Sequence, residues 1–129
     1  MDSFIVSEIF PISIEILFKA WLDSDMHAEM IGSSAEIDPS INVEFKIWDN
    51  YISGRTIEII PNKKIVQKWR TTEFSKTSKD SILELEFTET MGSTKLTLKH
   101  SLIPDGQGDD YKNGWIEYYF APMKEYFDR

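Results

Sequence analysis

The sequence predicts an α+β fold in which an antiparallel sheet packs against one long carboxy-terminal helix. Between residues 43 and 100, hydrophobic and polar residues alternate in runs joined by short turns, a pattern typical of strands with one buried face. Residues 109–127 instead carry large aromatic side chains at helical spacing, with Trp115, Tyr119 and Tyr126 on one face. Such a helix needs a wide apolar surface to lie on, and only the predicted sheet offers one.

The residues before the sheet predict one strand and two short helices. Residues 4–10 form a β-type run, and Pro11 ends it. Ser13 is a suitable N-cap for a helix whose apolar residues lie at i, i+3, i+4 and i+7, namely Ile14, Leu17, Phe18 and Trp21. The acidic segment 23–25 predicts the start of a second helix, which ends near Gly32.

The middle of the chain predicts an antiparallel meander. Alternating runs lie at residues 43–47, 54–59, 64–70, 83–88 and 95–100. Turn residues separate them, and the polar segment 71–79 predicts a longer loop. Because the chain contains no repeats and no linker-like segment, we expect residues 1–129 to form a single domain.

Composition and charge exclude several classes of function. The 129-residue chain is 41% hydrophobic and 28% charged, which is ordinary for a globular protein, and it contains no cysteine. Its net charge of −8 disfavours binding to nucleic acid or to an anionic membrane, because both need clustered Lys and Arg. No apolar run is long enough to span a membrane, and the amino terminus does not resemble a signal peptide. We therefore expect a cytoplasmic protein with no nucleic-acid or membrane partner.

The charged residues on the outer face of the predicted sheet alternate in sign from strand to strand. They are Glu58, then Lys64, Lys68 and Arg70, then Glu84 and Glu86, then Lys95 and Lys99. Opposite charges on neighbouring strands form favourable cross-strand pairs. We interpret this face as a solvated, self-neutralised surface and not as a phosphate-binding stripe.

Polar residues at inward-facing positions are the more informative signal, because a buried polar group needs a partner. Arg55, Gln67 and His100 lie at such positions on three predicted strands. If the inner face is hollow, they become polar contacts in an aromatic-lined ligand site. If it is packed, each must bond to protein groups or buried water. The predicted cavity candidates are Arg55, Gln67, Trp69, Phe87, His100, Trp115 and Tyr119.

The sequence gives little support for catalysis, a metal or a cofactor. His27 and His100 are the only histidines, and with no cysteine they cannot form a usual multi-histidine or thiolate metal site. No nucleophile motif or phosphate-binding glycine loop is present. An acid–base pair of His100 with Glu89 or Asp110 is conceivable in space, but no motif specifies it. We predict no catalytic residue, no metal and no cofactor.

Two motifs resemble a known family. Gly54-Arg55 is followed by Pro61-x-x-x-Ile65-x-x-x-Trp69-Arg70, and Gly114-Trp115 is followed by Tyr119-Phe120-x-Pro122. In combination, and over nearly the whole chain, they resemble the activator of heat shock protein 90 ATPase homologue family of the START-like (SRPBCC) superfamily, in its carboxy-terminal-type domain. The resemblance implies a helix-grip (Bet v 1-like) fold, with a cavity under the last helix that holds apolar ligands in relatives.

Three functions follow as hypotheses. The first is non-catalytic binding of a small, largely hydrophobic ligand in that cavity. The second, implied by the resemblance, is a co-chaperone-like module that binds a chaperone of the heat shock protein 90 class, with loop 71–80 as the expected contact. The third is a polyketide cyclase/dehydratase-like enzyme that uses His100 as acid or base. The space under the last helix discriminates the first from a packed core, since a void below ~100 Å³ is far smaller than ligand sites of ~300–1,000 Å³.

Two residues of the last helix carry further expectations. Pro122 lacks the N–H that a helix interior uses, so we expect a kink near residues 118–121. Gly114 is expected to let the first turns of the helix approach the sheet closely.

Overall fold

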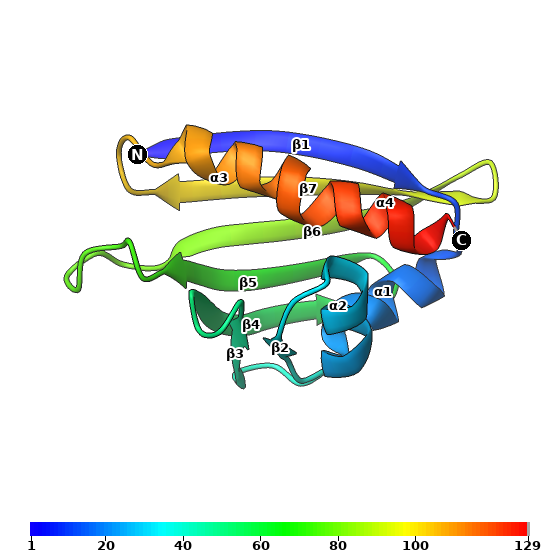
Figure 1. The fold of residues 1–129 in the computed structure, drawn as a ribbon, viewed down its shortest axis with the longest axis horizontal. Helices are drawn as coiled ribbons and strands as arrows, with labels where there is room; N and C mark the ends of the chain where they lie inside the picture. The colour runs from blue at the N-terminus through cyan, green and yellow to red at the C-terminus, as the bar shows by residue number, and fades with distance from the viewer. Residues whose placement is uncertain (129) are drawn as a thin grey trace.

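The computed structural model, which describes residues 1–128, contains one antiparallel sheet with a long helix across its concave face (Figure 1). The strands are β1 (Asp2–Phe10), β2 (Ala35–Glu36), β3 (Glu44–Ile47), β4 (Ile52–Ile60), β5 (Lys64–Thr71), β6 (Ser81–Thr90) and β7 (Ser93–Ile103). Their order in the sheet is β1-β7-β6-β5-β4-β3-β2. Strands β3 to β7 thus form the predicted meander, β1 joins it beside β7, and the helix-grip fold is confirmed.

The two predicted short helices follow β1 and are capped by the predicted residues. α1 (Ile14–Leu22) begins after Ser13, whose Oγ accepts a hydrogen bond from the Ile16 N–H at 3.4 Å. α2 (Ser24–Ile31) begins after Asp23, whose carboxylate accepts from the Met26 N–H at 2.9 Å. It ends at Gly32, which has the left-handed conformation (φ +69°) expected of a helix C-cap.

The carboxy-terminal helix is continuous but changes its hydrogen-bond pattern midway. α3 (Gly108–Gly114) leads into a six-residue π-helical segment, η1 (Trp115–Phe120), and then into α4 (Ala121–Phe127). The Ala121 N–H donates to the carbonyl of Ile116, five residues back. The widened segment ends just before Pro122, which has no N–H to donate to the preceding turn. The sequence predicted a disturbance at this place but not its π-helical form.

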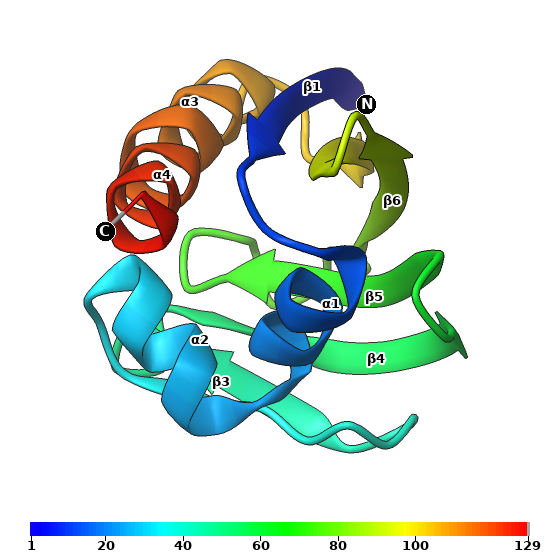
Figure 2. The same cartoon turned by 90° about the vertical axis from the view of Figure 1, so that its right-hand side faces the viewer.

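One half of the space between sheet and helix is filled by α1 and α2. Figure 2 shows α1 closing one end of this space, with α2 beside α4. The side chains of Leu17 and Trp21 are fully buried there, and the Phe18 ring packs edge-on against Phe87 at 5.1 Å. Met123 of α4 is also fully buried in this half. The rest of this core comes from the sheet, including Ile65, Leu83, Leu85, Leu96 and Leu98.

A bulge in β4 corrects the predicted orientation of Arg55. The pairing of β4 with β5 shifts between Thr56 and Glu58, so inward positions are even-numbered before the bulge and odd-numbered after it. Ile59 therefore packs toward the core, whereas Arg55 is exposed and its Nη1 donates to the carbonyl of Asn42 at 2.6 Å. The prediction that Arg55 faces the cavity was wrong, because it extended the alternation of residues 57–59 across the bulge.

The outer face carries the charge pairs that the sequence predicted. Lys64 lies 3.6 Å from Glu58 on β4 and 3.9 Å from Glu84 on β6, and Lys99 of β7 lies 2.9 Å from Glu86. These side chains are partly exposed, so solvent screens each pair and its contribution to stability is small. Within residues 1–128, no helix combines the length and the apolar character needed to span a membrane.

Candidate functional site

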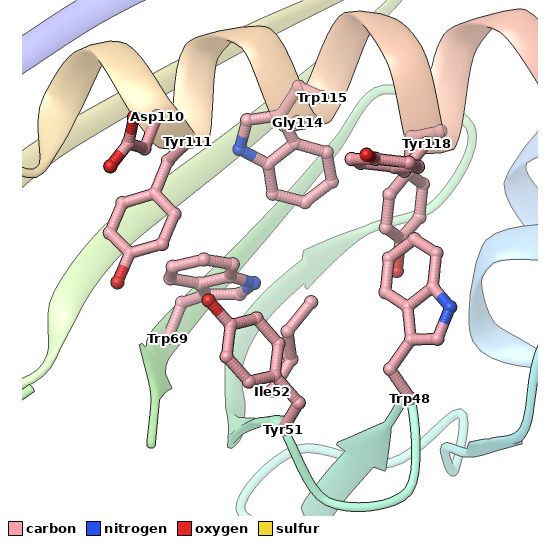
Figure 3. Close-up of a pocket in the computed structure, with 10 residues that line it drawn as sticks. Trp48, Tyr51, Ile52, Trp69, Asp110, Tyr111, Gly114, Trp115 and Tyr118 are labelled. Atoms are coloured by element: carbon pink, nitrogen blue, oxygen red, sulfur yellow. The ribbon is translucent and has the colours of Figure 1, made fainter. Parts of the chain in front are cut away.

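A cavity lies in the other half of the space under the helix, away from α1. Its volume is about 320 Å³, at the lower end of the range for small-molecule sites and well above a packing defect. Its walls are Trp48, Tyr51, Ile52, Trp69, Asp110, Tyr111, Gly114, Trp115, Tyr118 and Tyr119 (Figure 3). Because Asp110 and Tyr118 are exposed, the cavity opens to solvent beside the helix.

The helix contributes one wall through the aromatic stripe that the sequence displays. Tyr111, Trp115 and Tyr119 follow one another at intervals of four residues and are all buried. Trp115 and Tyr119 belong to the π-helical segment, and their ring centroids lie 4.5 Å apart. Inserted π-helical turns are frequent at functional sites. Here the segment carries the central rings of the cavity wall.

The turn between β3 and β4 contributes the opposite wall. Trp48, Asp49 and Asn50 all have left-handed backbones, with φ of +54°, +50° and +73°. Ser34 holds this strained turn, since its Oγ accepts from the Asp49 N–H at 2.8 Å and its carbonyl from the Trp48 N–H at 3.0 Å. The Trp48 ring is thereby held edge-on to Tyr119, at 5.5 Å. Such strain is uncommon for non-glycine residues and clusters at functional sites.

His100 holds two cavity rings from behind. The Trp115 Nε1–H donates to His100 Nδ1 at 3.1 Å, so the neutral ring carries its proton on Nε2. Nε2 then donates to Ser81 Oγ at 2.8 Å, and Ser81 Oγ donates to the Trp69 carbonyl at 2.7 Å. Burial lowers the pKa of His100 to about 3, so the ring is neutral at physiological pH. Both ring nitrogens are engaged, which gives no support to an acid–base role.

His27, to which sequence reasoning gave no role, holds the Tyr119 ring from behind by a hydrogen bond. Its Nδ1 donates to the Trp21 carbonyl at 2.7 Å, so its Nε2 accepts from the Tyr119 hydroxyl at 2.9 Å. Burial lowers the pKa of His27 to about 4 and raises the pKa of Tyr119. No sequence motif marks this contact, because its partners are 92 residues apart.

Gln67 and Phe87 lie in the filled half and do not line the cavity. The Trp21 Nε1–H donates to Gln67 Oε1 at 3.4 Å, and Gln67 Nε2 donates to Thr56 Oγ1 at 3.0 Å. Trp21 in turn stacks on Trp115, with ring centroids 6.1 Å apart. Gln67 therefore supports the cavity wall through Trp21.

The seven predicted candidates thus divide into four groups. Trp69, Trp115 and Tyr119 line the cavity, and ligand contact by them stays a prediction. His100 and Gln67 are buried behind the wall, Phe87 packs under α1, and Arg55 is on the outer face. Sequence reasoning missed four aromatic wall residues, Trp48, Tyr51, Tyr111 and Tyr118, as well as Ile52, Asp110 and Gly114. The turn residues Asp49-Asn50 and the helical stripe were the signals that could have indicated them.

Two hydroxyl groups at the cavity rim are already paired within the protein. The Tyr111 hydroxyl donates to Gln107 Oε1 at 2.6 Å and lies 2.6 Å from Thr71 Oγ1, while the Tyr51 hydroxyl donates to the Glu73 carboxylate. Burial raises the pKa of Tyr51 and of Tyr111, so both are neutral phenols. Among residues 1–128, no three His, Asp or Glu side chains are grouped so that they could hold a metal ion. The walls of the cavity are thus apolar and largely aromatic.

Comparison with known proteins adds a family match over most of the chain. The sequence model of the family described as "Activator of Hsp90 ATPase homolog 1-like protein" matches residues 11–128. The human "Activator of 90 kDa heat shock protein ATPase homolog 1" is 25% identical over 122 residues, and homolog 2 of Mus musculus is 25% identical over 119. These matches cover 95% and 92% of the chain but 36% of each relative, so the chain spans about a third of their length.

A solved structure of similar size is also similar in fold. It is the crystal structure of a Plasmodium falciparum protein described as an HSP90 activator, with a TM-score of 0.86 and 29% sequence identity. The match covers 95% of this chain and 94% of that one. The match therefore covers nearly the whole solved chain of the Plasmodium falciparum protein, whereas it covers about a third of each mammalian relative.

Proposed function

The chain belongs to the family of Activator of Hsp90 ATPase homolog 1-like proteins, and on this premise we propose that it binds a small, largely apolar molecule between its sheet and its long helix. The observation that carries the proposal is the cavity of about 320 Å³, whose walls are almost entirely aromatic. Ligand sites are commonly built as preformed, largely apolar hollows with few polar groups. Binding here needs no catalytic residue and no cofactor.

The support behind the walls favours a site that is formed before the ligand arrives. Trp115 is bonded to His100, Tyr119 to His27, and Tyr111 to Gln107 and Thr71. Each bond fixes a ring that would otherwise have to be ordered on binding. Rings fixed in advance reduce the entropy cost of binding, which favours affinity for a rigid ligand.

An NMR titration with a panel of lipids, flavonoids and polyketides tests the proposal. We expect shifts confined to the cavity residues, such as the Trp69 and Trp115 indoles and the Ile52 methyl groups. Shifts only on the outer sheet face, or none across the panel, would contradict it.

Gly114 offers a variant that fills the cavity with little cost to the fold. It lines the cavity, its backbone is helical, and the nearest atom to an added Cβ is Tyr118 Cδ2 at 4.0 Å. Gly114→Leu should therefore fold normally and weaken binding at least tenfold. Asn113→Leu, which adds a leucine on the exposed side of the same turn, is the matched control and should bind like the unaltered protein.

We propose binding to a chaperone of the heat shock protein 90 class, in the cytoplasm, as a second function. The specific observation is the Plasmodium falciparum HSP90 activator, which is similar over nearly its full solved length. Loop 71–80 is the expected contact. Arg70 holds its shape by donating to the carbonyls of Ser75 at 2.9 Å and Ser78 at 3.0 Å, and by pairing with Asp80 at 2.9 Å.

A pull-down against such a chaperone, followed by an ATPase assay, tests the second proposal. Lys76→Glu with Lys79→Glu reverses two exposed charges on the loop and should reduce binding. Lys95→Glu on the outer face of β7 is the control and should not. No binding at tens of micromolar protein would contradict this function.

A further inference from the structure

We infer that the ligand of the cavity is a flat, uncharged aromatic molecule carrying a hydrogen-bond acceptor oxygen, which accepts the Nε1–H of Trp69. This inference rests on the proposed small-molecule function and names the chemical class that the site selects. It is carried by one unused donor on a buried side chain, by the shape of the walls and by the charges around them.

The donor is the indole N–H of Trp69. Of the buried tryptophans, Trp21 donates to Gln67 and Trp115 donates to His100. Trp69 is only 3% exposed, yet within residues 1–128 its Nε1–H has no acceptor. Its nitrogen is not sealed off, since no fully enclosed side-chain nitrogen of the described chain lacks a partner. Figure 3 shows this nitrogen directed into the space between Trp115 and Ile52.

When a ligand displaces water from this donor, free energy is lost unless the ligand supplies an acceptor in its place. The neighbouring rings leave Trp69 little freedom to turn away. Its ring lies 4.6 Å from His100, 5.1 Å from Tyr111 and 5.8 Å from Trp115. In addition, Ser81 Oγ accepts a hydrogen bond from His100 Nε2 and donates one to the Trp69 carbonyl. The N–H is therefore presented in a fixed direction.

The walls favour a flat ligand of limited size. Rings approach the cavity from the helix, through Tyr111 and Trp115, and from the strands and their turn, through Trp48, Tyr51 and Trp69 (Figure 3). Flat aromatic molecules pack between such rings in offset or edge-on arrangements. The volume of about 320 Å³ suits two or three fused rings better than a long acyl chain.

The charges favour a neutral acceptor over a carboxylate. Among the described residues that line the cavity, none is Lys, Arg or His, and Asp110 places a carboxyl group at the mouth. An anionic ligand would lose hydration with no cation to replace it, and the net charge of −8 would oppose its approach. A ketone, quinone or ether oxygen can accept the hydrogen bond from Trp69 without the loss of hydration that an anion suffers.

Three naphthalenes of nearly equal shape test the inference. 2-Acetylnaphthalene carries a neutral acceptor, 2-isopropenylnaphthalene replaces its oxygen with CH₂, and 2-naphthoate carries a carboxylate. The ketone should bind about 3- to 10-fold more tightly than the alkene, as expected for one hydrogen bond, and more tightly than the carboxylate. In ¹⁵N-edited NMR, the Trp69 indole proton should move downfield with the ketone and not with the alkene.

Replacing only the N–H of Trp69 separates the effect of its hydrogen bond from the effect of its ring packing. Trp69 replaced by β-(3-benzothienyl)alanine keeps the bicyclic shape but exchanges N–H for sulfur, so the preference for ketone over alkene should disappear. The same replacement at Trp48 is the control, because Figure 3 shows the Trp48 nitrogen on the edge facing away from Trp69. It should leave the preference intact.

The possible outcomes distinguish failure of this inference from failure of the proposed small-molecule binding. Equal binding of ketone and alkene inside the cavity, with an unmoved Trp69 indole proton, overturns the acceptor requirement and leaves the binding function standing. Tighter binding of the carboxylate overturns the requirement for a neutral ligand. No binding of the three naphthalenes or of the wider panel overturns both proposals.

Discussion

The two halves of the space beneath the long helix are both walled by apolar side chains but end in opposite states. Under α4, the side chains of Leu17, Phe18 and Trp21 enter from α1 and fill the space against the sheet. Toward α3 the contacts of α1 end at the Trp115 and Tyr119 rings, and a cavity of about 320 Å³ remains beyond them. Aromatic rings form the boundary in both. The amphipathic pattern of the long helix is therefore compatible with either state, and the position of α1 decides which one forms.

The boundary between the halves is held by buried polar groups. Trp21 stacks on Trp115 across it, and Gln67, His27 and His100 bond to rings on either side. Each polar side chain in this boundary has a partner, which is required of groups removed from water. The hollow half thus keeps its shape because the filled half and its polar contacts support the cavity walls.

Removing a ring from each half should give the largest contrast. Trp21→Ala deletes a ring that is 1% exposed and leaves Gln67 Oε1 without its donor, so we expect a loss of about 3–5 kcal/mol in the free energy of unfolding. Trp48→Ala removes a half-buried ring from the open cavity and should cost about 1 kcal/mol or less. Urea denaturation measures both. Equal losses would mean that the cavity is closed and packed in solution.

The buried histidines should make the boundary sensitive to acid. The pKa of His27 is lowered to about 4 and that of His100 to about 3, whereas both would titrate near 6.5 in the unfolded chain. The unfolded state therefore binds more protons below pH 6.5, and stability falls as the pH falls. From pH 7 to pH 5 the two should together lose on the order of 4 kcal/mol, at up to about 1.4 kcal/mol per pH unit each.

Non-titrating variants separate this effect from the titration of carboxylates. His27→Gln and His100→Gln should each be less stable at pH 7, and each should show a shallower decline between pH 7 and pH 5. Thermal or urea unfolding across this range gives the slopes. A decline as steep as that of the unaltered protein would assign the pH dependence to other groups.

Substitutions at Gln67 and Arg55, two predicted site residues, should differ in their effect on stability. Gln67 supports the boundary between the halves, whereas Arg55 lies on the outer face. Gln67→Leu leaves the Trp21 Nε1–H without its acceptor and Thr56 Oγ1 without its donor, and should cost about 1–2 kcal/mol. Arg55→Ala removes an exposed side chain with one backbone contact and should change stability by less than about 0.5 kcal/mol. Chemical denaturation of both variants checks the contrast. A large loss at Arg55 would contradict its assignment to the outer face.

A small gain in stability is expected from a substitution in the hollow itself. Gly114→Ala adds a methyl group in open space on a helical backbone, so we expect a gain of about 0.5–1 kcal/mol. The thermal midpoint should rise by a few degrees. A loss of stability would mean that something fills this space in solution.

The sequence predicted the fold because its signals are local. The alternation in β5, β6 and β7, and the caps at Ser13 and Asp23, depend on residues close together in the chain. The orientation of Arg55 was wrong because one extra residue in a bulge inverts the face without changing the residue types.

The state of the cavity depends on contacts that no local pattern encodes. Gly114 was expected to bring the helix close to the sheet, yet an added Cβ there would meet only Tyr118, at 4.0 Å. His27 reaches Tyr119 across 92 residues, and α1 enters one half of the space and not the other. Whether facing apolar surfaces touch or leave a hollow is set by side-chain volumes in three dimensions.

The central claim is that a ligand occupies the hollow half and not the filled one, and intermolecular NOEs from bound 2-acetylnaphthalene test it directly. Ile52 is the one aliphatic side chain among the described cavity-lining residues, whereas Leu17 and Leu85 are fully buried in the filled half. We predict NOEs from the naphthyl protons to the Ile52 methyl groups and to the Trp69 and Trp115 rings, with none to Leu17 or Leu85. NOEs to outer-face methyl groups such as those of Ile5 or Ile82, without NOEs to Ile52, would contradict the claim.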